Sequence, residues 1–338
     1  MSLREMRIQG GLLSLLAMGL ALLACSRSMP RAPKAFPDAD IVFETSTSWN
    51  ERPNGTLGFI KPDSSALTYL TVRIPNEWGG QGSPIFPLIT ADGSVIAFRT
   101  LSGPRHAGKL ILWPANGEAL ECDVGLGFER PAPTFGEGKL TIDTVDGGGQ
   151  VVVFDLAECL AGRTPSLTTI VSASGPNYIY YGAVSPAGDL VAYVQWEADR
   201  ETYTITVRPV EGGPQRELAE GIAPAWSPDG ETIAYTWVDG IYLTDPNGTD
   251  ERKIVDYTSP DVGGQPIFND WWPPLPSWSP DGQWLVYHKC ILPPGPRTDC
   301  GSSSEDYAIF KVNVETGEEI KILDGGLNPY WRWKPEQP

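Results

Sequence analysis

The chain has 338 residues, among them 37 glycines, 32 prolines and 12 tryptophans, and its formal net charge is -17. After residue 25 no stretch places apolar residues at helical spacing, and segments rich in Val, Ile, Tyr and Thr predict an all-β protein. The negative charge argues against a nucleic-acid partner, because phosphate binding needs a surplus of Lys and Arg. The negative charge would also repel anionic lipid headgroups. We interpret it as a feature that keeps the protein soluble.

Residues 1–24 are predicted to be a lipoprotein signal peptide. Arg4 and Arg7 precede an apolar run that is too short to span a bilayer comfortably. The run ends in LLAC, which resembles the lipobox of bacterial lipoproteins. This resemblance implies that Cys25 is acylated, so that an exported protein is held on a membrane and faces the periplasm or the cell exterior. An ordinary secretory signal with a chance cysteine is the alternative.

Residues 25–37 contain three prolines and no apolar periodicity. This composition predicts a flexible, extended tether. The folded part is therefore expected to begin at Asp38 and to form one domain that extends to residue 338.

Turn glycines separated by 42 to 52 residues mark a repeat within this domain, at Gly93, Gly138, Gly188, Gly230 and Gly282. Prolines keep the same register, each two residues before an apolar or aromatic residue, at Pro87, Pro133, Pro224, Pro276 and Pro329. An aromatic residue also follows four of the glycines by five positions, at Phe98, Tyr193, Tyr235 and Tyr287. This period is typical of the four-stranded blades of a β-propeller.

Two copies of the repeat contain the sequence WSPDG, which predicts a sharp turn. Pro228 fixes φ, Asp229 can bond its own backbone, and Gly230 supplies a positive φ. The flanking strands are almost continuously apolar, which suits sheets covered on both faces. Neighbouring blades would supply that cover, with Trp226 and Trp278 as wedges between them.

The two ends of the chain are predicted to share one blade. The C-terminal sequence NPYWRWKPEQP contains the proline and the aromatic residue that mark one strand of the repeat, at Pro329 and Trp331, but not the strands that should follow. Three strands near the start of the chain lack such a strand before them. Five complete repeats and this composite blade give a six-bladed β-propeller. Its first blade is closed by the C-terminal strand, which requires the segment of Trp331 to lie beside that of Phe43, and this closure removes free sheet edges.

The WSPDG repeat resembles the TolB-type, WD-like propeller repeat. That repeat occurs in periplasmic TolB and in the non-catalytic propellers of prolyl oligopeptidase and dipeptidyl peptidase relatives. The resemblance covers most of the chain after residue 83 and implies the propeller fold. It does not extend to the separate N-terminal domain of TolB, so a role in the Tol assembly is not implied. The sequence G-x-S-x-G, expected of the hydrolase half of those peptidases, does not occur.

Export to an oxidising compartment predicts that the four remaining cysteines form disulfides. Cys290 and Cys300 bracket a loop rich in Pro and Gly and are expected to pair locally. The pairing of Cys122 with Cys159 then follows by elimination. A zinc site is the alternative, but the sequence has neither C-x-x-C nor a nearby pair of histidines.

Long loops are predicted on one face of the propeller, and short turns on the other. Long loops on a rigid scaffold usually carry binding sites, and aromatic residues dominate interface hot spots. The residues predicted to bind a ligand or partner on the loop-rich face are Trp49, Trp78, His106, Trp196, Trp271 and Trp272. For Trp271 and Trp272 the alternative is that their side chains plug the central channel.

No catalytic residue, cofactor or metal site is predicted. His106 and His288 fall in different blades, and His288 is expected to be a hydrogen-bonded structural residue. Calcium stays an alternative, because oxygen ligands alone can bind it and Asp143, Asp146 or Asp239 could supply them. No loop, however, has the spacing of an EF-hand.

We therefore expect a non-catalytic, membrane-anchored protein that binds a partner protein or a glycan through its loop-rich face. One alternative is a carbohydrate-active hydrolase or lyase that uses carboxylates at the propeller channel. The other is a structural module of an envelope assembly.

Overall fold

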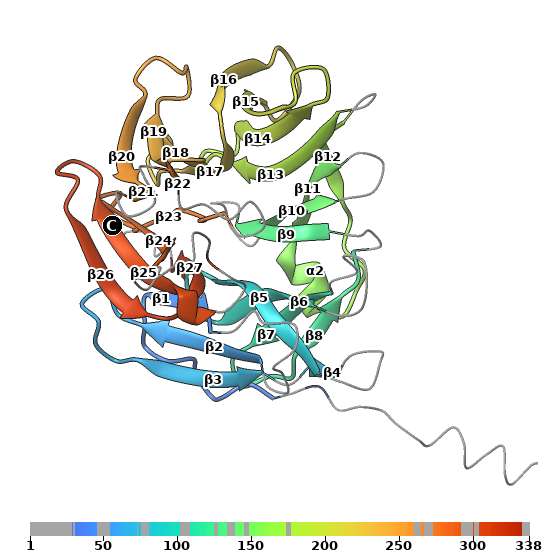
Figure 1. Cartoon of the computed structure of the whole chain (residues 1–338). Helices are drawn as coiled ribbons and strands as arrows, with labels where there is room; N and C mark the ends of the chain where they lie inside the picture. The colour runs from blue at the N-terminus through green and yellow to red at the C-terminus, as the bar shows by residue number, and fades with distance from the viewer. Residues whose placement is uncertain are drawn as a thin grey trace, which may run out of the picture.

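The computed structural model describes residues 29, 31–45, 55–72, 74–75, 81–101, 109–124, 128–133, 139–144, 149–173, 177–259, 265–266, 273–291, 300 and 304–332. Within these ranges, six antiparallel sheets of four or five strands surround a central axis (Figure 1). The predicted six-bladed β-propeller is therefore confirmed. No helix of the described residues is long and apolar enough to cross a bilayer.

Each blade is numbered here in chain order, and its strands are given from the channel outward. Blade 1 consists of β27 (Leu327–Trp331), β1 (Ile41–Glu44), β2 (Gly55–Ile60) and β3 (Thr68–Val72). Blade 2 consists of β5 (Gln81–Ile89), β6 (Val95–Leu101), β7 (Leu110–Pro114) and β8 (Leu120–Cys122), with β4 (Ile74–Pro75) added to β5. Blade 3 consists of β9 (Phe128–Pro133), β10 (Lys139–Thr144), β11 (Gln150–Asp155) and β12 (Thr168–Ser172).

The other three blades follow the same plan. Blade 4 consists of β13 (Tyr178–Val184), β14 (Leu190–Glu197), β15 (Thr202–Pro209) and β16 (Arg216–Glu220). Blade 5 consists of β17 (Ile222–Trp226), β18 (Ile233–Trp237), β19 (Gly240–Thr244) and β20 (Arg252–Asp256). Blade 6 consists of β23 (Ser277–Trp278), β24 (Trp284–Cys290), β25 (Tyr307–Asn313) and β26 (Glu319–Asp324). Smaller elements are β21 (Thr258–Ser259), β22 (Gln265–Pro266), the helix α2 (Leu156–Leu160) and the 3-10 turn η3 (Ser304–Asp306).

The C-terminal strand closes blade 1, as predicted. β27 pairs antiparallel with β1, with Trp331 opposite Ile41 and Leu327 opposite Glu44 (Figure 1). This pairing closes the ring, because one sheet contains strands from near both ends of the described chain.

Trp226 and Trp278 lie between blades, which confirms their predicted role as wedges. Both side chains are buried. The indole Nε1 of Trp226 donates to the carbonyl oxygen of Ala183 in blade 4 at 2.9 Å. In the same way, Trp278 Nε1 donates to the carbonyl oxygen of Ala225 in blade 5 at 3.0 Å. Each ring thus fills apolar space at a junction while its polar atom binds the neighbouring inner strand.

The WSPDG turns have the chemistry expected from their residues. Gly230 adopts a φ of 75°, and its amide donates to the carbonyl oxygen of Ser227 at 2.9 Å. Asp229 Oδ1 accepts from the amide of Glu231 at 2.9 Å, and Ser227 Oγ accepts from the amide of Thr232 at 2.9 Å. The chain therefore reverses within a few residues, and the face that carries these turns stays shallow.

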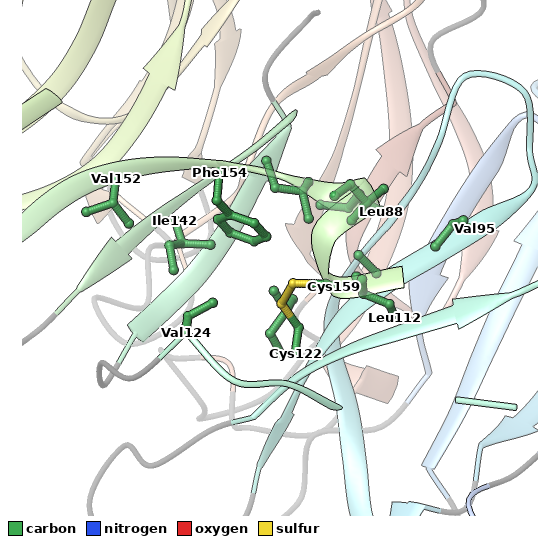
Figure 2. Packing of buried hydrophobic residues seen from close by; sticks show 13 residues of the cluster. Leu88, Val95, Leu112, Cys122, Val124, Ile142, Val152, Phe154 and Cys159 are labelled. Carbon is green, nitrogen blue, oxygen red and sulfur yellow. A yellow bond between two sulfur atoms is a disulfide. The ribbon is translucent and has the colours of Figure 1, made fainter. Parts of the chain in front are cut away.

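Both predicted disulfides are present. Cys290 pairs with Cys300, and Cys122 of β8 pairs with Cys159 of α2. The second bond joins blade 2 to the connection that follows β11 in blade 3, inside an apolar cluster shared by the two blades (Figure 2). The sequence did not predict α2, a single turn that begins after the N-cap Asp155.

Residues 31–37, which the sequence assigns to a tether, pack on blade 2. We call this segment the strap. The amide of Ala32 donates to the carbonyl oxygen of Gly117 at 2.7 Å, and the amide of Asn116 donates to that of Pro33 at 2.7 Å. Phe36 meets Trp113 edge-on, with ring centroids 5.6 Å apart. Since these contacts order the segment, the packed part of the chain begins before Asp38.

Candidate functional site

The innermost strands line the central channel and carry a repeated irregularity. In four of them a residue other than glycine adopts a positive φ, namely Phe86 at 50°, Tyr181 at 53°, Ala223 at 55° and Asn328 at 44°. Each lies at a β-bulge, where the register with the second strand shifts. A left-handed conformation costs such a residue roughly 1–2 kcal/mol, so contacts around the bulge must hold it in place.

Polar side chains on the second strands supply several of these contacts. They occupy one position of the repeat, which directly follows the position that is aromatic in most copies. In blade 4 this position holds an apolar residue. The six equivalent residues, all buried, are Glu44, Arg99, Asp143, Val194, Thr236 and His288. We use the name polar ring for Glu44, Asp143, Thr236 and His288.

Two carboxylates of the polar ring bind bulges in the next blade. Glu44 Oε1 accepts from the amide of Phe86 at 2.6 Å. Asp143 accepts from two successive amides, those of Tyr181 and of Gly182, the second at 2.7 Å. Hydrogen bonds from backbone amides to a carboxylate are shorter and stronger than those between neutral groups, and they fix its orientation. These two groups therefore stabilise strained backbone.

The other two members of the polar ring also make hydrogen bonds across a blade junction. His288 Nδ1 accepts from the amide of Asn328 at 3.1 Å, which bears out the structural role expected for this histidine. Asn328 Nδ2 donates to Glu44 Oε1 at 2.7 Å, so blades 6 and 1 are connected through one chain of hydrogen bonds. Thr236 Oγ1 donates to the carbonyl oxygen of Pro274 at 2.8 Å. The polar ring thus joins successive blades beside the channel.

The channel contains a cavity of about 130 Å³. Its walls come from the inner strands of blades 1, 2, 4, 5 and 6 together with Asp143, and most lining residues are apolar or aromatic. Among the residues that the structure describes, the polar side chains that line it are Asp143, Tyr181, Ser277, Asn328 and Tyr330, together with the indoles of Trp226 and Trp278. Since Asp143 and Asn328 are already bonded, the cavity favours an apolar group over a charged one.

A second feature lies on blade 4, where three aromatic residues stand in a row across three strands. Tyr178 of β13 is opposite Trp196 of β14, and Trp196 is opposite Tyr203 of β15. Directly opposed residues of an antiparallel sheet project from the same face. The rings of Trp196 and Tyr203 have centroids 4.7 Å apart, and Tyr178 stacks on Tyr180. We call Tyr178, Trp196 and Tyr203 the aromatic ladder.

The aromatic ladder is exposed because blade 4 extends beyond blade 5. Below the ladder, Tyr180 of the same sheet face packs with Ile222 and Tyr235 in the junction with blade 5. β14 continues four residues beyond Tyr193, to Glu197, whereas β18 continues only two beyond the equivalent Tyr235. The ladder therefore passes the edge of its neighbour, and Tyr178 and Tyr203 remain 46% and 38% exposed.

Of the residues predicted to bind a ligand, the structure describes Trp196 and places it in the aromatic ladder. The others lie outside the described residues, namely Trp49, Trp78, His106, Trp271 and Trp272. Cys25 and Asp146 lie outside them as well. The structure therefore shows one of the predicted aromatic residues beside partners that the sequence analysis did not single out.

The described carboxylates considered for calcium have other partners. Asp143 belongs to the polar ring, and Asp239 accepts from Lys253 and from the hydroxyl of Tyr242. Partial burial would raise the pKa of Asp239, but the hydrogen bonds from Lys253 and Tyr242 outweigh it and lower the pKa. Among the residues that the structure describes, no three His, Cys, Asp or Glu side chains are grouped as metal ligands.

Sequence reasoning missed the polar ring and two members of the aromatic ladder. A signal for the ring was available, because Glu44, Thr236 and His288 each follow an aromatic residue at one position of the repeat. For Tyr178 and Tyr203 no such signal exists. Their contact with Trp196 depends on the register of three strands.

The fold is similar to that of solved β-propellers at low sequence identity. TolB from Acinetobacter baumannii gives a TM-score of 0.62 at 14% identity over 94% of this chain and 70% of that chain. A putative TolB from Agrobacterium tumefaciens gives 0.58 at 16% identity over 85% and 96%. Hydrazine synthase from Kuenenia stuttgartiensis gives 0.57 at 12% identity over 92% and 48%.

These similarities show that the chain has a TolB-like propeller fold, and at such identities they show the fold alone. No family model matches the sequence, and no curated protein matches it either.

Proposed function

We propose that this protein is an exported, lipid-anchored β-propeller that binds a partner protein or a glycan at its loop-rich face and does not catalyse a reaction. The observation that carries the proposal is the use of the buried polar groups beside the channel. Glu44, Asp143 and His288 hold the strained bulges of the inner strands. The accessible part of blade 4 includes the aromatic ladder, and exposed aromatic rings are the chemistry of an interface hot spot.

The same observation weighs against the hydrolase or lyase alternative. Such an enzyme needs two carboxyl groups that are free to exchange protons with a substrate. Asp143 is the carboxylate that lines the channel cavity among the described residues, and its two oxygens accept the amides of Tyr181 and Gly182.

A pull-down from native envelopes tests the proposed function. The full chain is compared with the variant that carries Trp271→Ala and Trp272→Ala. We expect the wild-type chain to retain a stoichiometric partner and the double variant to lose it. Release of sugar fragments from envelope polysaccharides by the purified chain, abolished by Asp143→Asn, would contradict the proposal and favour the enzyme.

The anchor is tested separately with Cys25→Ala. Acyl chains contribute about 0.8 kcal/mol for each buried CH₂, so the wild-type chain should sediment with membranes. The variant is expected to appear in the soluble fraction and to lose incorporation of labelled fatty acid. If it remains in the membrane fraction, the protein is not held by a lipid on Cys25.

A further inference from the structure

The end of blade 4 that carries the aromatic ladder is also acidic. Five carboxylates lie on the β14–β15 turn and on the adjacent strand β16, namely Glu197, Asp199, Glu201, Glu217 and Glu220. Arg200 is the basic residue of this turn, and its guanidinium pairs with Glu197 and Glu217, each at 3.1 Å. Asp199, Glu201 and Glu220 stand outside these two pairs, and five carboxylates against one guanidinium give this end of the blade a net charge of -4.

The other basic residues of blade 4 lie toward the opposite end of its strands. Arg208 is opposite Val191 near the start of β14, and Arg216 is opposite Val207 near the end of β15. Arg216 also donates to Asn247 in blade 5. Apart from Arg200, the positive charge of blade 4 is therefore kept away from the aromatic ladder, and the carboxylates around the ladder make its field negative.

Exposed aromatic rings within an acidic field favour a cationic ligand. A guanidinium or ammonium group is attracted by the face of Trp or Tyr within about 6 Å of the ring centroid. Carboxylates around the rings strengthen this attraction and steer the approach of a positive group. An anionic glycan would be repelled by the same field, and by the net charge of -17.

We infer that the aromatic ladder binds a basic, extended segment of a partner protein, with Arg or Lys side chains over the rings of Tyr178, Trp196 and Tyr203. This inference rests on the proposed function, to which it adds the site and the chemistry of the partner. An extended segment fits because the three rings stand in a straight row across the sheet. Arg is also enriched at protein interfaces, where its planar group stacks on aromatic rings.

The test is a fluorescence titration of the full chain, purified in detergent, with labelled peptides of equal length. The probe alternates Arg with Ser, and the controls replace Arg by Gln or by Glu. A neutral β-1,4-linked glucose hexamer is titrated in parallel. We expect the Arg peptide alone to bind and its affinity to fall as salt rises, because surface charges are screened.

The variant Tyr178→Ala with Tyr203→Ala removes two exposed rings and leaves Trp196 in place. Two cation–π contacts at an exposed site correspond to an affinity loss of roughly tenfold. Tyr69→Ala is the matched control, since Tyr69 is 52% exposed but lies in blade 1. This control is expected to bind the peptide as the wild-type chain does. Unchanged thermal unfolding of the double variant confirms that its fold is intact.

A second variant tests the charges without changing the rings. Asp199→Asn with Glu201→Gln alters two exposed residues of the turn. We expect about threefold weaker binding of the Arg peptide at low salt and a smaller salt dependence.

Several results would overturn the inference. One is equal binding of the Gln peptide. Another is equal affinity of the double tyrosine variant, and a third is no binding of the Arg peptide at concentrations up to about 1 mM. Binding of the glucose hexamer that is lost in the same variant would assign the ladder to neutral glycans.

The outcome for the ladder is separable from that of the envelope pull-down. A partner lost with Trp271→Ala and Trp272→Ala but retained by the tyrosine variant leaves the proposed function standing and removes the inference.

Discussion

At the junction of blades 4 and 5 a tryptophan fills the space between two sheets, whereas at the junction of blades 2 and 3 a disulfide crosses it. Trp226 packs with Ala183 and Ile233 and donates to the carbonyl oxygen of Ala183. Between blades 2 and 3, Cys122 and Cys159 lie within an aliphatic cluster (Figure 2). Blade 5 carries a full WSPDG repeat, and the repeat of blade 3 is degenerate. A covalent bond therefore reinforces the junction whose repeat has diverged.

The largest loss of stability is expected for Trp226→Ala. Truncation of a buried Trp leaves a cavity and typically costs about 3–5 kcal/mol, and it also removes the donor to the Ala183 carbonyl. Trp226→Phe restores most of the apolar contact and should cost clearly less. Urea unfolding followed by fluorescence measures both variants. Equal unfolding free energies for Trp226→Ala and the wild-type chain would show that the wedge does not hold this junction.

Removal of the disulfide between blades 2 and 3 is expected to rank second. Its partners are separated by 37 residues, and the chain-entropy relation for a loop of this size gives roughly 3–4 kcal/mol. Cys290 and Cys300 are separated by only 10 residues, so their removal should cost less. Unfolding of Cys122→Ala with Cys159→Ala, compared with Cys290→Ala with Cys300→Ala, measures the difference. The reverse order would mean that strain or local contacts outweigh loop size.

Replacing one member of the polar ring should have an intermediate effect. In Asp143→Asn the side-chain NH2 group replaces one of the two oxygens, so one of the two backbone amides loses its acceptor. A buried polar group without a hydrogen-bond partner costs about 1–3 kcal/mol. Thr236→Val, the corresponding change in blade 5, removes a single donor to Pro274 and should cost about 1 kcal/mol. Thermal unfolding of the two variants compares them. A larger loss for Thr236→Val would show that the bulge of blade 4 does not depend on Asp143.

The smallest effect concerns the turn of blade 2, where Asp92 takes the place of the WSPDG aspartate. Partial burial would raise the pKa of Asp92, but hydrogen bonds from Thr90 and Ser94 outweigh it, so the pKa lies below 3.8. A depressed pKa stabilises the fold above pH 3.8, and this contribution is lost as the pH falls through the folded-state value. The stability difference between wild type and Asp92→Asn should therefore shrink from pH 5 to pH 2. A constant difference would show that the charge of Asp92 has no role.

The sequence predicts the ring of blades because its signals are local and repeated. A turn such as that at Gly230 needs only adjacent residues, and the pairing of Trp331 with Ile41 follows from counting strands at the two ends. The bulges were not predicted, since a positive φ at Phe86 or Tyr181 violates the ordinary preference of these residues and depends on hydrogen bonds from the preceding blade. Tertiary pairing decides such positions, and a single sequence does not display it.

The candidate site was predicted only in outline for a related reason. Trp196 stands at a strand end on the loop-rich face, and sequence alone was sufficient to select it. Its exposure, however, depends on the difference in length between the β14–β15 and β18–β19 hairpins of two separate blades. The acidic surroundings of Trp196 also come from two places that are separated in the sequence by β15, namely the β14–β15 turn and strand β16.

The strap determines how an anchored propeller would be oriented. It contacts Asn116 and Gly117 in the turn between β7 and β8, on the side of the molecule opposite the β14–β15 turn. With Cys25 acylated as proposed, five residues separate the lipid from Arg31, and a fully extended chain of that length spans about 20 Å. The shallow side would then lie against the bilayer, and the aromatic ladder would point outward, within reach of a partner that never touches the membrane.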